Sequence, residues 1–270
     1  MMKKLVFSLP LLLLLPSVPA QVMAPNVDGV SMGQVGTIVR DIDATKKFWA
    51  VMGGTPIKID KVDVIKVPGV LVFMRPGTPS GGSMGTAVDH PGFHVPNGQE
   101  TLEKFKAAGY KVEFNPRAAG LGYVYSPDDL RVEILGNEVL SDNKITVPAV
   151  SDHLHIFLPE AAVPEAQAWY IKTLGAMSSV GPGKSAAADL PGIRFFFGRA
   201  PNPPMPTKGH ALDYIGFEIK DLQAFCKKLE AGGIKLDQPY SKSRHKGYAS
   251  AELTDPWGAS IELTEGLKRF

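Results

Sequence analysis

The sequence predicts an α+β fold built from four repeated units, each with a strand, a helix and then several strands. Two observations lead to this prediction. The chain contains two similar halves, residues 30–140 and 149–268, and each half contains two smaller units of the same kind. Within each unit, short runs rich in β-branched and aromatic residues are separated by Pro, Gly and Asp turns, and helical spacing follows the first run. A chain of 270 residues has room for two domains of ordinary size.

The first unit of each half opens on an apolar strand, which a polar turn, a helix and a glycine follow. Residues 33–54 and residues 152–176 share this order, and further strands follow at 68–79 and 191–204. Each helical segment carries an aromatic pair, which we expect to lie in the core because large apolar side chains are buried on folding. The pairs are Phe48-Trp49 and Trp169-Tyr170.

The second unit of each half opens on one of two related strands, DHPGFHV at 89–95 and DYIGFEI at 213–219. Apolar residues at helical spacing come next, and the helices are expected to end at Gly109 and Gly232, where a capping glycine belongs. The turn sequences SPDD and DPWG then precede the last strands, RVEIL and SIELT. The two halves therefore repeat one pattern from beginning to end.

The first 20 residues have the composition of a secretory signal. Lys3 and Lys4 precede a Leu-rich run that ends at Leu15, and Ala20 provides a small residue at the cleavage point. The apolar run is too short to span a bilayer comfortably. We therefore expect residues 1–20 to be removed, and the protein to be exported to the bacterial periplasm or the exterior without a stable membrane anchor.

Charge and cysteine content exclude several classes of function. A formal net charge of +2 gives no reason to expect a nucleic-acid partner. Cys226 is the only cysteine, so no disulfide can form within the chain, and its place in a helical segment predicts a packing role. No nucleotide-binding glycine motif and no Ser-His-Asp signature can be placed.

The order of these motifs resembles the vicinal oxygen chelate superfamily, which includes glyoxalase I, methylmalonyl-CoA epimerase, extradiol dioxygenases and the bleomycin and fosfomycin resistance proteins. DHPGFHV opens one unit and TDPWGASIELTEG closes another, in the order that the family shows. The resemblance covers nearly all of the chain after the signal. It implies tandem βαβββ modules that form two open eight-stranded barrels, with a divalent metal ion inside a barrel.

For the N-terminal half, the resemblance implies three metal ligands. Gln34 lies on the first strand, His90 on the second opening strand and Glu133 in the closing strand. Amide, imidazole and carboxylate groups form a hard-to-borderline set that suits a divalent ion. Glu133 is also expected to move a proton during catalysis. His94 shares the strand parity of His90 and is expected to face the substrate.

For the C-terminal half, the resemblance implies His153 and Glu262 as ligands, with Glu262 as the second candidate for proton transfer. His155 has the same strand parity as His153 and is its rival, or a substrate contact. Tyr214 stands where extradiol dioxygenases carry a second His. A phenol is a poor ligand for ferrous iron at neutral pH, since its unperturbed pKa is about 10. Tyr214 is therefore expected to contact the substrate.

The function implied is that of an exported metal-dependent enzyme acting on a small substrate with vicinal oxygens. The metal would be Zn²⁺, Ni²⁺, Mn²⁺ or Fe²⁺, acting as a Lewis acid. Because Tyr214 departs from the dioxygenase pattern, lyase or isomerase chemistry of the glyoxalase type ranks slightly above ring cleavage. The alternative is a non-catalytic protein that binds small molecules, like the bleomycin resistance members. A homodimer is a candidate assembly, and which half would be active stays open.

Overall fold

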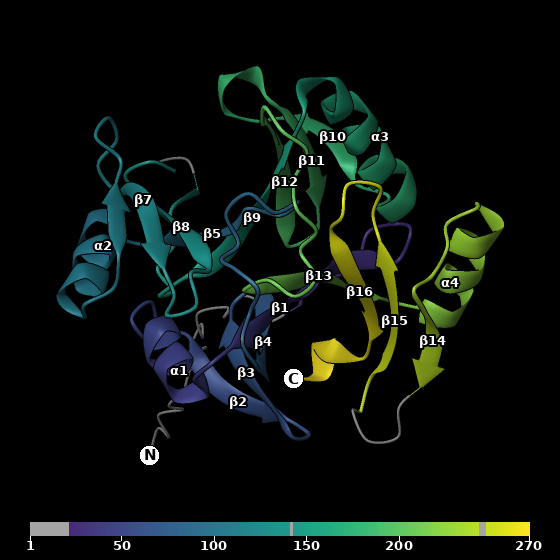
Figure 1. Cartoon of the computed structure of the whole chain (residues 1–270), viewed down its shortest axis with the longest axis horizontal. Coiled ribbons are helices and arrows are strands. Elements are labelled where there is room, and N and C mark those ends of the chain that lie inside the picture. The colour runs from purple at the N-terminus through teal and green to yellow at the C-terminus, as the bar shows by residue number, and fades with distance from the viewer. Residues whose placement is uncertain (1–21, 141–142, 243–246) are drawn as a thin grey trace, which may run out of the picture.

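The computed structural model describes residues 22–140, 143–242 and 247–270. The expected signal at 1–20 and His245, for which the sequence predicts a loop position, lie outside the described residues. No helix in the described part of the chain has both the length and the apolar character needed to cross a membrane. The described residues form sixteen strands and four α-helices in the predicted order, with one helix after the first strand of each unit (Figure 1).

Each unit is a βαβββ module. The first contains β1 (Val30–Val39), α1 (Ile42–Ala50), β2 (Thr55–Ile59), β3 (Val62–Val67) and β4 (Val70–Pro76). The second contains β5 (His90–Val95), α2 (Gly98–Ala107), β6 (Val112–Phe114), β7 (Leu121–Tyr125) and β8 (Arg131–Gly136). The third contains β9 (Val150–Leu158), α3 (Val163–Leu174), β10 (Met177–Val180), β11 (Ala186–Leu190) and β12 (Ile193–Arg199). The fourth contains β13 (Leu212–Ile219), α4 (Leu222–Ala231), β14 (Gln238–Lys242), β15 (Ala249–Thr254) and β16 (Ser260–Glu265).

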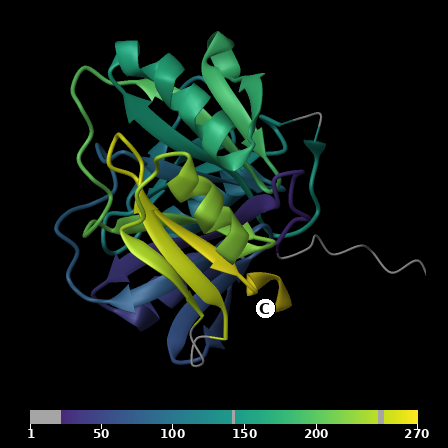
Figure 2. The same cartoon turned by 90° about the vertical axis from the view of Figure 1, so that its right-hand side faces the viewer.

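The strands form two open eight-stranded sheets, which confirms the α+β class with tandem modules. The first sheet has the order β14-β15-β16-β13-β1-β4-β3-β2, and the second has the order β10-β11-β12-β9-β5-β8-β7-β6. The first sheet therefore joins the first unit to the fourth, and the second sheet joins the second unit to the third. In Figure 2 the yellow-green C-terminal unit lies beside the blue N-terminal unit.

This pairing corrects the expectation that each half of the sequence forms its own barrel. The central contacts are antiparallel pairings across the halves, β1 with β13 and β5 with β9. Within a half, the two units instead meet through their hydrophobic side chains. Trp49 of α1 contacts Phe93 of β5, with ring centroids 5.4 Å apart, and Phe195 of β12 contacts Phe217 of β13, with centroids 6.0 Å apart. The domain boundaries 30–140 and 149–268 stay a prediction. The two sheets are not divided along these boundaries, because each sheet contains strands from both halves.

The helices begin and end where the sequence indicated. Asp41 caps α1 by accepting hydrogen bonds from the backbone N–H groups of Asp43 and Ala44, and Asp221 caps α4 in a similar way. Gly109 follows α2 with a φ of +87°, which only glycine adopts without cost. After α4, the positive φ falls on Gly233 instead of Gly232, so the predicted cap is displaced by one residue.

The aromatic pairs and the lone cysteine lie as expected. Phe48, Trp49 and Tyr170 are fully buried, Trp169 is partly buried, and Cys226 is a buried free thiol in α4. The helices lie on the outside of the molecule, and the central strands of both sheets run through its middle (Figure 1). Apolar faces of helices and sheets thus share one core, which holds the central strands rigidly in place.

Candidate metal centre

Four side chains in the second sheet converge on one point. They come from three adjacent strands: His90 begins β5, Glu133 lies in β8, and His153 and His155 lie in β9. One ligand atom from each residue lies within 4.8 Å of those of the other three. We call these four residues the histidine cluster.

Strand register explains why these residues meet. His90 pairs with His155, and Gly92 pairs with both His153 and Glu133. Residues two apart on a strand point to the same face, so all four side chains project on one side of the sheet. Gly92 leaves the space that the His153 ring occupies, because a Cβ atom at this position would collide with that imidazole.

Glu133 joins the two most buried imidazoles. Its Oε2 lies 2.9 Å from Nε2 of His153 and 3.2 Å from Nε2 of His90. Nδ1 of His155 lies 3.1 Å from Nε2 of His90. His90, His153 and Glu133 are buried, whereas His155 is partly exposed. The cluster therefore has one member that faces an opening and three that lie deeper.

A second carboxylate orients each of two imidazoles. Nδ1 of His90 lies 2.6 Å from Oδ1 of Asp89, and Nδ1 of His153 lies 2.8 Å from Oδ2 of Asp152. Asp89 is itself held by Arg131, whose Nη1 donates across 2.9 Å. These contacts fix both rings with Nδ1 protonated, so that Nε2 faces the centre of the cluster, as is typical of metal-ligating histidines.

The ionisation states follow from burial and from these contacts. Burial by itself would raise the pKa of Glu133, but hydrogen bonds from His153 and His90 outweigh it and hold that pKa well below its usual range. Burial would lower the pKa of His153, but Asp152 and Glu133 raise it to about 9. Burial lowers the pKa of His155 to about 3, and the neighbouring imidazoles add to this effect. Glu133 therefore stays a carboxylate, and His155 stays neutral at neutral pH.

The donor set fits a divalent transition metal ion. Imidazole nitrogen and carboxylate oxygen are ligands of Zn²⁺, Mn²⁺, Fe²⁺ and Ni²⁺, and His90, His153 and Glu133 match a two-histidine, one-carboxylate set. The orienting carboxylates Asp89 and Asp152 are a further feature of such sites. His155 supplies a fourth nitrogen at the more exposed side.

Aromatic rings surround the cluster. Phe196 lies 5.0 Å from the ring centroid of His153, Phe157 stacks on His155 at 4.8 Å, and Tyr123 lies 5.2 Å from His90. The Arg131 guanidinium lies over the Tyr123 ring, 3.6 Å from its centroid. These walls lower the local dielectric, which strengthens the interactions of the charged groups inside.

The structure does not group the predicted ligands by sequence halves. Gln34 lies in the first sheet, where its amide donates to Glu262 across 2.7 Å, so the expected set of Gln34 with His90 and Glu133 is wrong. The expected grouping of His153 with Glu262 is wrong for the same reason. Each sheet combines strands from both halves, and His153 therefore joins the two N-terminal residues.

Tyr214 and His94 also lie outside the cluster. Tyr214 is in β13 of the first sheet, so it does not take the place of a histidine beside His153. His94 is buried near the end of β5, and its Nε2 lies 2.8 Å from the Asn137 side chain, which places it in a structural contact. The orienting role of Asp89 and Asp152 was not predicted, although the repeated dipeptide Asp-His was visible in the sequence.

The chain was compared with known proteins. A family model described as the Glyoxalase/Bleomycin resistance protein/Dioxygenase superfamily matches residues 152–263. Residues 152–263 are therefore similar to this superfamily. The matched region spans β9 to β16 and therefore contributes strands to both sheets. No curated protein sequence matches the chain.

Solved structures share the fold over most of the chain. Glyoxalase I from Zea mays has a TM-score of 0.67 at 16% identity, over 89% of this chain and 94% of the other. A putative dioxygenase from Bacillus subtilis has a TM-score of 0.64 at 13% identity, over 92% and 86%. The cppA protein from Streptococcus pneumoniae has a TM-score of 0.51 at 10% identity, over 91% and 100%. At identities this low, the structural similarity establishes the fold, and the reaction has to be argued from the residues of the site.

Proposed function

We propose that the protein is a metal-dependent enzyme that acts on a small substrate with two adjacent oxygen atoms. The observation that carries the proposal is the histidine cluster, in which four ligand atoms of suitable type converge at the middle of a superfamily sheet. His90, Glu133 and His153 would hold the ion. A bound divalent ion would supply Lewis-acid stabilisation of negative charge on the substrate oxygens.

The residues around the cluster would prepare the site in three ways. Asp89 and Asp152 orient the two buried imidazoles through Nδ1. Phe157 and Phe196 form apolar walls that exclude water from a bound substrate. Glu133 would accept a substrate proton, whereas Glu262, the other predicted acid–base group, belongs to the first sheet.

The composition of the cluster favours oxygenase chemistry over the lyase or isomerase chemistry that ranked first from the sequence. That ranking rested on Tyr214 in place of a second histidine, and His90 would take this role because it shares the cluster with His153. Two histidines and one carboxylate are typical of non-haem Fe²⁺ oxygenases. The lyase or isomerase alternative depends on His155, because four protein ligands would leave fewer positions for a second substrate.

Metal content tests the proposal directly. The protein, purified without a histidine tag, should contain metal in near-stoichiometric amount by elemental analysis. His90→Ala and His153→Ala should each lose it, because each removes a buried nitrogen donor, while Gln34→Ala in the first sheet should retain it. Iron would support oxygenase chemistry, and zinc or nickel the lyase alternative.

Two results would contradict this proposal. Equal metal loss in Gln34→Ala would place the site elsewhere. A failure to bind Fe²⁺, Zn²⁺, Ni²⁺ or Mn²⁺ at all would leave non-catalytic binding of small molecules as the better account.

We further propose that the protein works outside the cytoplasm. The support is the charged, apolar and small-residue order of residues 1–20. N-terminal sequencing of protein from the periplasmic fraction should give a chain that begins after Ala20. Recovery of the full-length chain in the cytoplasmic fraction would contradict export.

A further inference from the structure

The first sheet contains a pocket of about 370 Å³ that is separate from the histidine cluster. Its walls come from β1, β3, β4, β13, β15 and β16, so it lies in the middle of the sheet. Phe73, Tyr214 and Tyr248 provide aromatic surface, and Val62 and Met74 add apolar side chains. A pocket of this size with mainly apolar walls holds a small organic molecule.

The pocket occupies the position in the first sheet that the cluster occupies in the second. Gly216 pairs with one residue on each side strand, as Gly92 does in the second sheet. This register places each residue of the cluster beside its counterpart. The corresponding pairs are His153 and Gln34, His90 and Tyr214, His155 and Gly36, and Glu133 and Glu262.

The counterparts retain the carboxylate and lack all three imidazoles. Gly36 has no side chain, and the Tyr214 ring lies in the space above it, where a Cβ atom would collide with that ring. Burial, together with the nearby Glu262 carboxylate, holds the pKa of Tyr214 and that of Tyr248 above the usual range. Both side chains therefore present neutral phenols, which suit an organic ligand better than a divalent ion.

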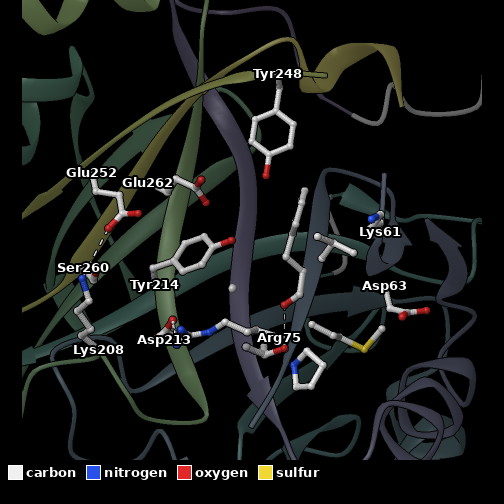
Figure 3. A pocket seen from close by; sticks show the side chains of 16 residues that line it. Lys61, Asp63, Arg75, Lys208, Asp213, Tyr214, Tyr248, Glu252, Ser260 and Glu262 are labelled. Atoms are coloured by element: carbon white, nitrogen blue, oxygen red, sulfur yellow. Dashed lines mark hydrogen bonds and ion pairs between the residues drawn. The ribbon is translucent and has the colours of Figure 1, made fainter. Parts of the chain in front are cut away.

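The buried carboxylate of the pocket has hydrogen-bond partners within the protein. Gln34 donates to Oε2 of Glu262 across 2.7 Å, and hydrogen bonding to Glu262 also contributes to the raised pKa of Tyr214. Figure 3 shows the hydroxyl groups of Tyr214 and Tyr248 and the Glu262 carboxylate pointing into the same space. A cationic ligand would have to compete with these donors, and an anionic ligand would be repelled by the carboxylate.

The other acidic side chains of the pocket are held in ion pairs. Arg75 donates to Asp213 across 2.9 Å, and the Lys208 ammonium lies 3.6 Å from Glu252. Asp63 lies 2.8 Å from the Lys46 ammonium. These pairs compensate the charges of both signs, so they leave little net attraction for an ionised ligand.

Lys61 is the remaining basic side chain of the lining. It is exposed, so water and salt screen its charge. An ion that enters the pocket must give up its hydration, and a screened charge at the rim returns little of that cost. A neutral molecule avoids most of this cost and still gains from contact with the aromatic walls.

We propose that this pocket is a second ligand-binding site, which takes a small neutral aromatic molecule and needs no metal ion. The flat body of the ligand packs against Phe73 and Tyr214, since aromatic rings prefer offset or edge-to-face contact with one another. Val62 and Met74 complete the apolar wall around it. This site goes beyond the metal-dependent activity proposed above and does not depend on it.

Three probes of similar size test the proposal: 2-phenylethanol, phenethylamine and phenylacetate, which carry zero, positive and negative charge. Each is titrated into the full chain by calorimetry with EDTA present. 2-Phenylethanol should bind at least about tenfold more tightly than either ion, because an ion loses more hydration on burial than an alcohol does. Equal or tighter binding of either ion, or no binding of the alcohol at millimolar concentration, would overturn the proposal.

A variant at the rim separates the attraction of Lys61 from the contacts inside the pocket. Lys61→Ala should leave the affinity for 2-phenylethanol unchanged, since this side chain is exposed and the ligand carries no charge. A preference for phenylacetate in the wild type that disappears in Lys61→Ala would instead reveal a site for anions, which would overturn the assignment to neutral molecules.

Two matched substitutions assign the binding to this pocket. Val62→Phe adds a larger side chain at a partly buried position of the lining and should lower the affinity for 2-phenylethanol about tenfold. Val180→Phe makes the same change at an exposed position of β10, outside the pocket, and should leave the affinity unchanged. Equal affinity in these two variants would overturn the assignment, and the probe series still applies if Val62→Phe is unstable.

A third variant distinguishes this site from the metal centre. His153→Ala, in the histidine cluster, should bind 2-phenylethanol as the wild type does, although it is expected to lose metal. A loss of 2-phenylethanol binding in His153→Ala but not in Val62→Phe would place the ligand at the cluster and overturn the proposal. Because the titrations contain EDTA, their result is independent of metal content, which reports separately on the enzyme proposed above.

Discussion

At the scale of single residues, the histidine cluster depends on contacts behind the ligands. Asp89 and Asp152 each precede a clustered histidine and bind its Nδ1. Arg131 holds Asp89 in place, and it also lies over the Tyr123 ring. Such contacts fix ring orientation and raise ligand basicity, so they matter for metal affinity although they lie outside the coordination sphere.

We predict that Asp152→Asn weakens metal binding about 10- to 100-fold, since loss of an orienting carboxylate typically has this effect. A competition titration against a chelator with a known metal affinity measures the change. Asp43→Asn, at an exposed position in α1, serves as the control and should bind as the wild type does. Unchanged affinity in Asp152→Asn would show that His153 is oriented by other contacts.

At the scale of elements, glycines on the central strands make room for the functional side chains. Gly92 in β5 faces the His153 imidazole, and Gly216 in β13 faces the Gln34 side chain. Both stand at the same register position in their sheets. The repeated x-Gly-Phe of the opening strands therefore has a steric reason, because any larger residue would push a side chain off the face of the sheet.

Alanine substitutions at Gly92 and Gly216 should differ in their effect on metal affinity. Gly92→Ala should displace the His153 ring and lower metal affinity, while Gly216→Ala should disturb only Gln34 in the first sheet and leave metal affinity as it is. Both should lower thermal stability, because a buried collision costs about 1–3 kcal/mol. Metal titration and thermal unfolding of the two variants measure both effects. Equal metal loss in both variants would contradict the assignment of the cluster to the second sheet.

At the scale of the whole molecule, the two sheets and the two halves are interleaved. Each sheet takes one unit from each half, and each half packs its two units together through buried aromatic side chains. Tyr170 of the third unit donates to Asp255 of the fourth across 2.9 Å in this packed region. Unfolding of one half would therefore break pairings in both sheets.

The burial of the Asp255 carboxyl should make stability depend on pH. Burial raises the pKa of Asp255, and hydrogen bonds from Ala259 and Tyr170 offset only part of this effect. A carboxyl whose folded pKa lies above its unfolded value stabilises the fold most below the unfolded value, about 3.9, and loses this contribution as pH rises through the folded value. Compared with the wild type, Asp255→Asn should therefore gain relative stability as pH rises. Urea unfolding of both proteins at several pH values measures the difference, and a constant difference would contradict the raised pKa.

The sequence by itself determined the repeat, the order of elements and most of the residue types at the sites. Periodicity and turn residues act locally, so β-strands, helices and the buried aromatic pairs followed from them. The sequence also showed which residues of the two halves correspond, since aligned repeats keep their positions along each strand. These pairs are His153 with Gln34, Glu133 with Glu262 and His90 with Tyr214.

Only the tertiary structure decided which of these residues meet. Strand pairing is a long-range contact, and an internal repeat is equally compatible with sheets formed within a half or across the halves. The pairing of β5 with β9 and of β1 with β13 brought three histidines and Glu133 together and left Gln34, Tyr214 and Glu262 in the other sheet. The sequence thus specified the chemistry of the side chains, whereas the composition of each site depended on which strand edges paired on folding.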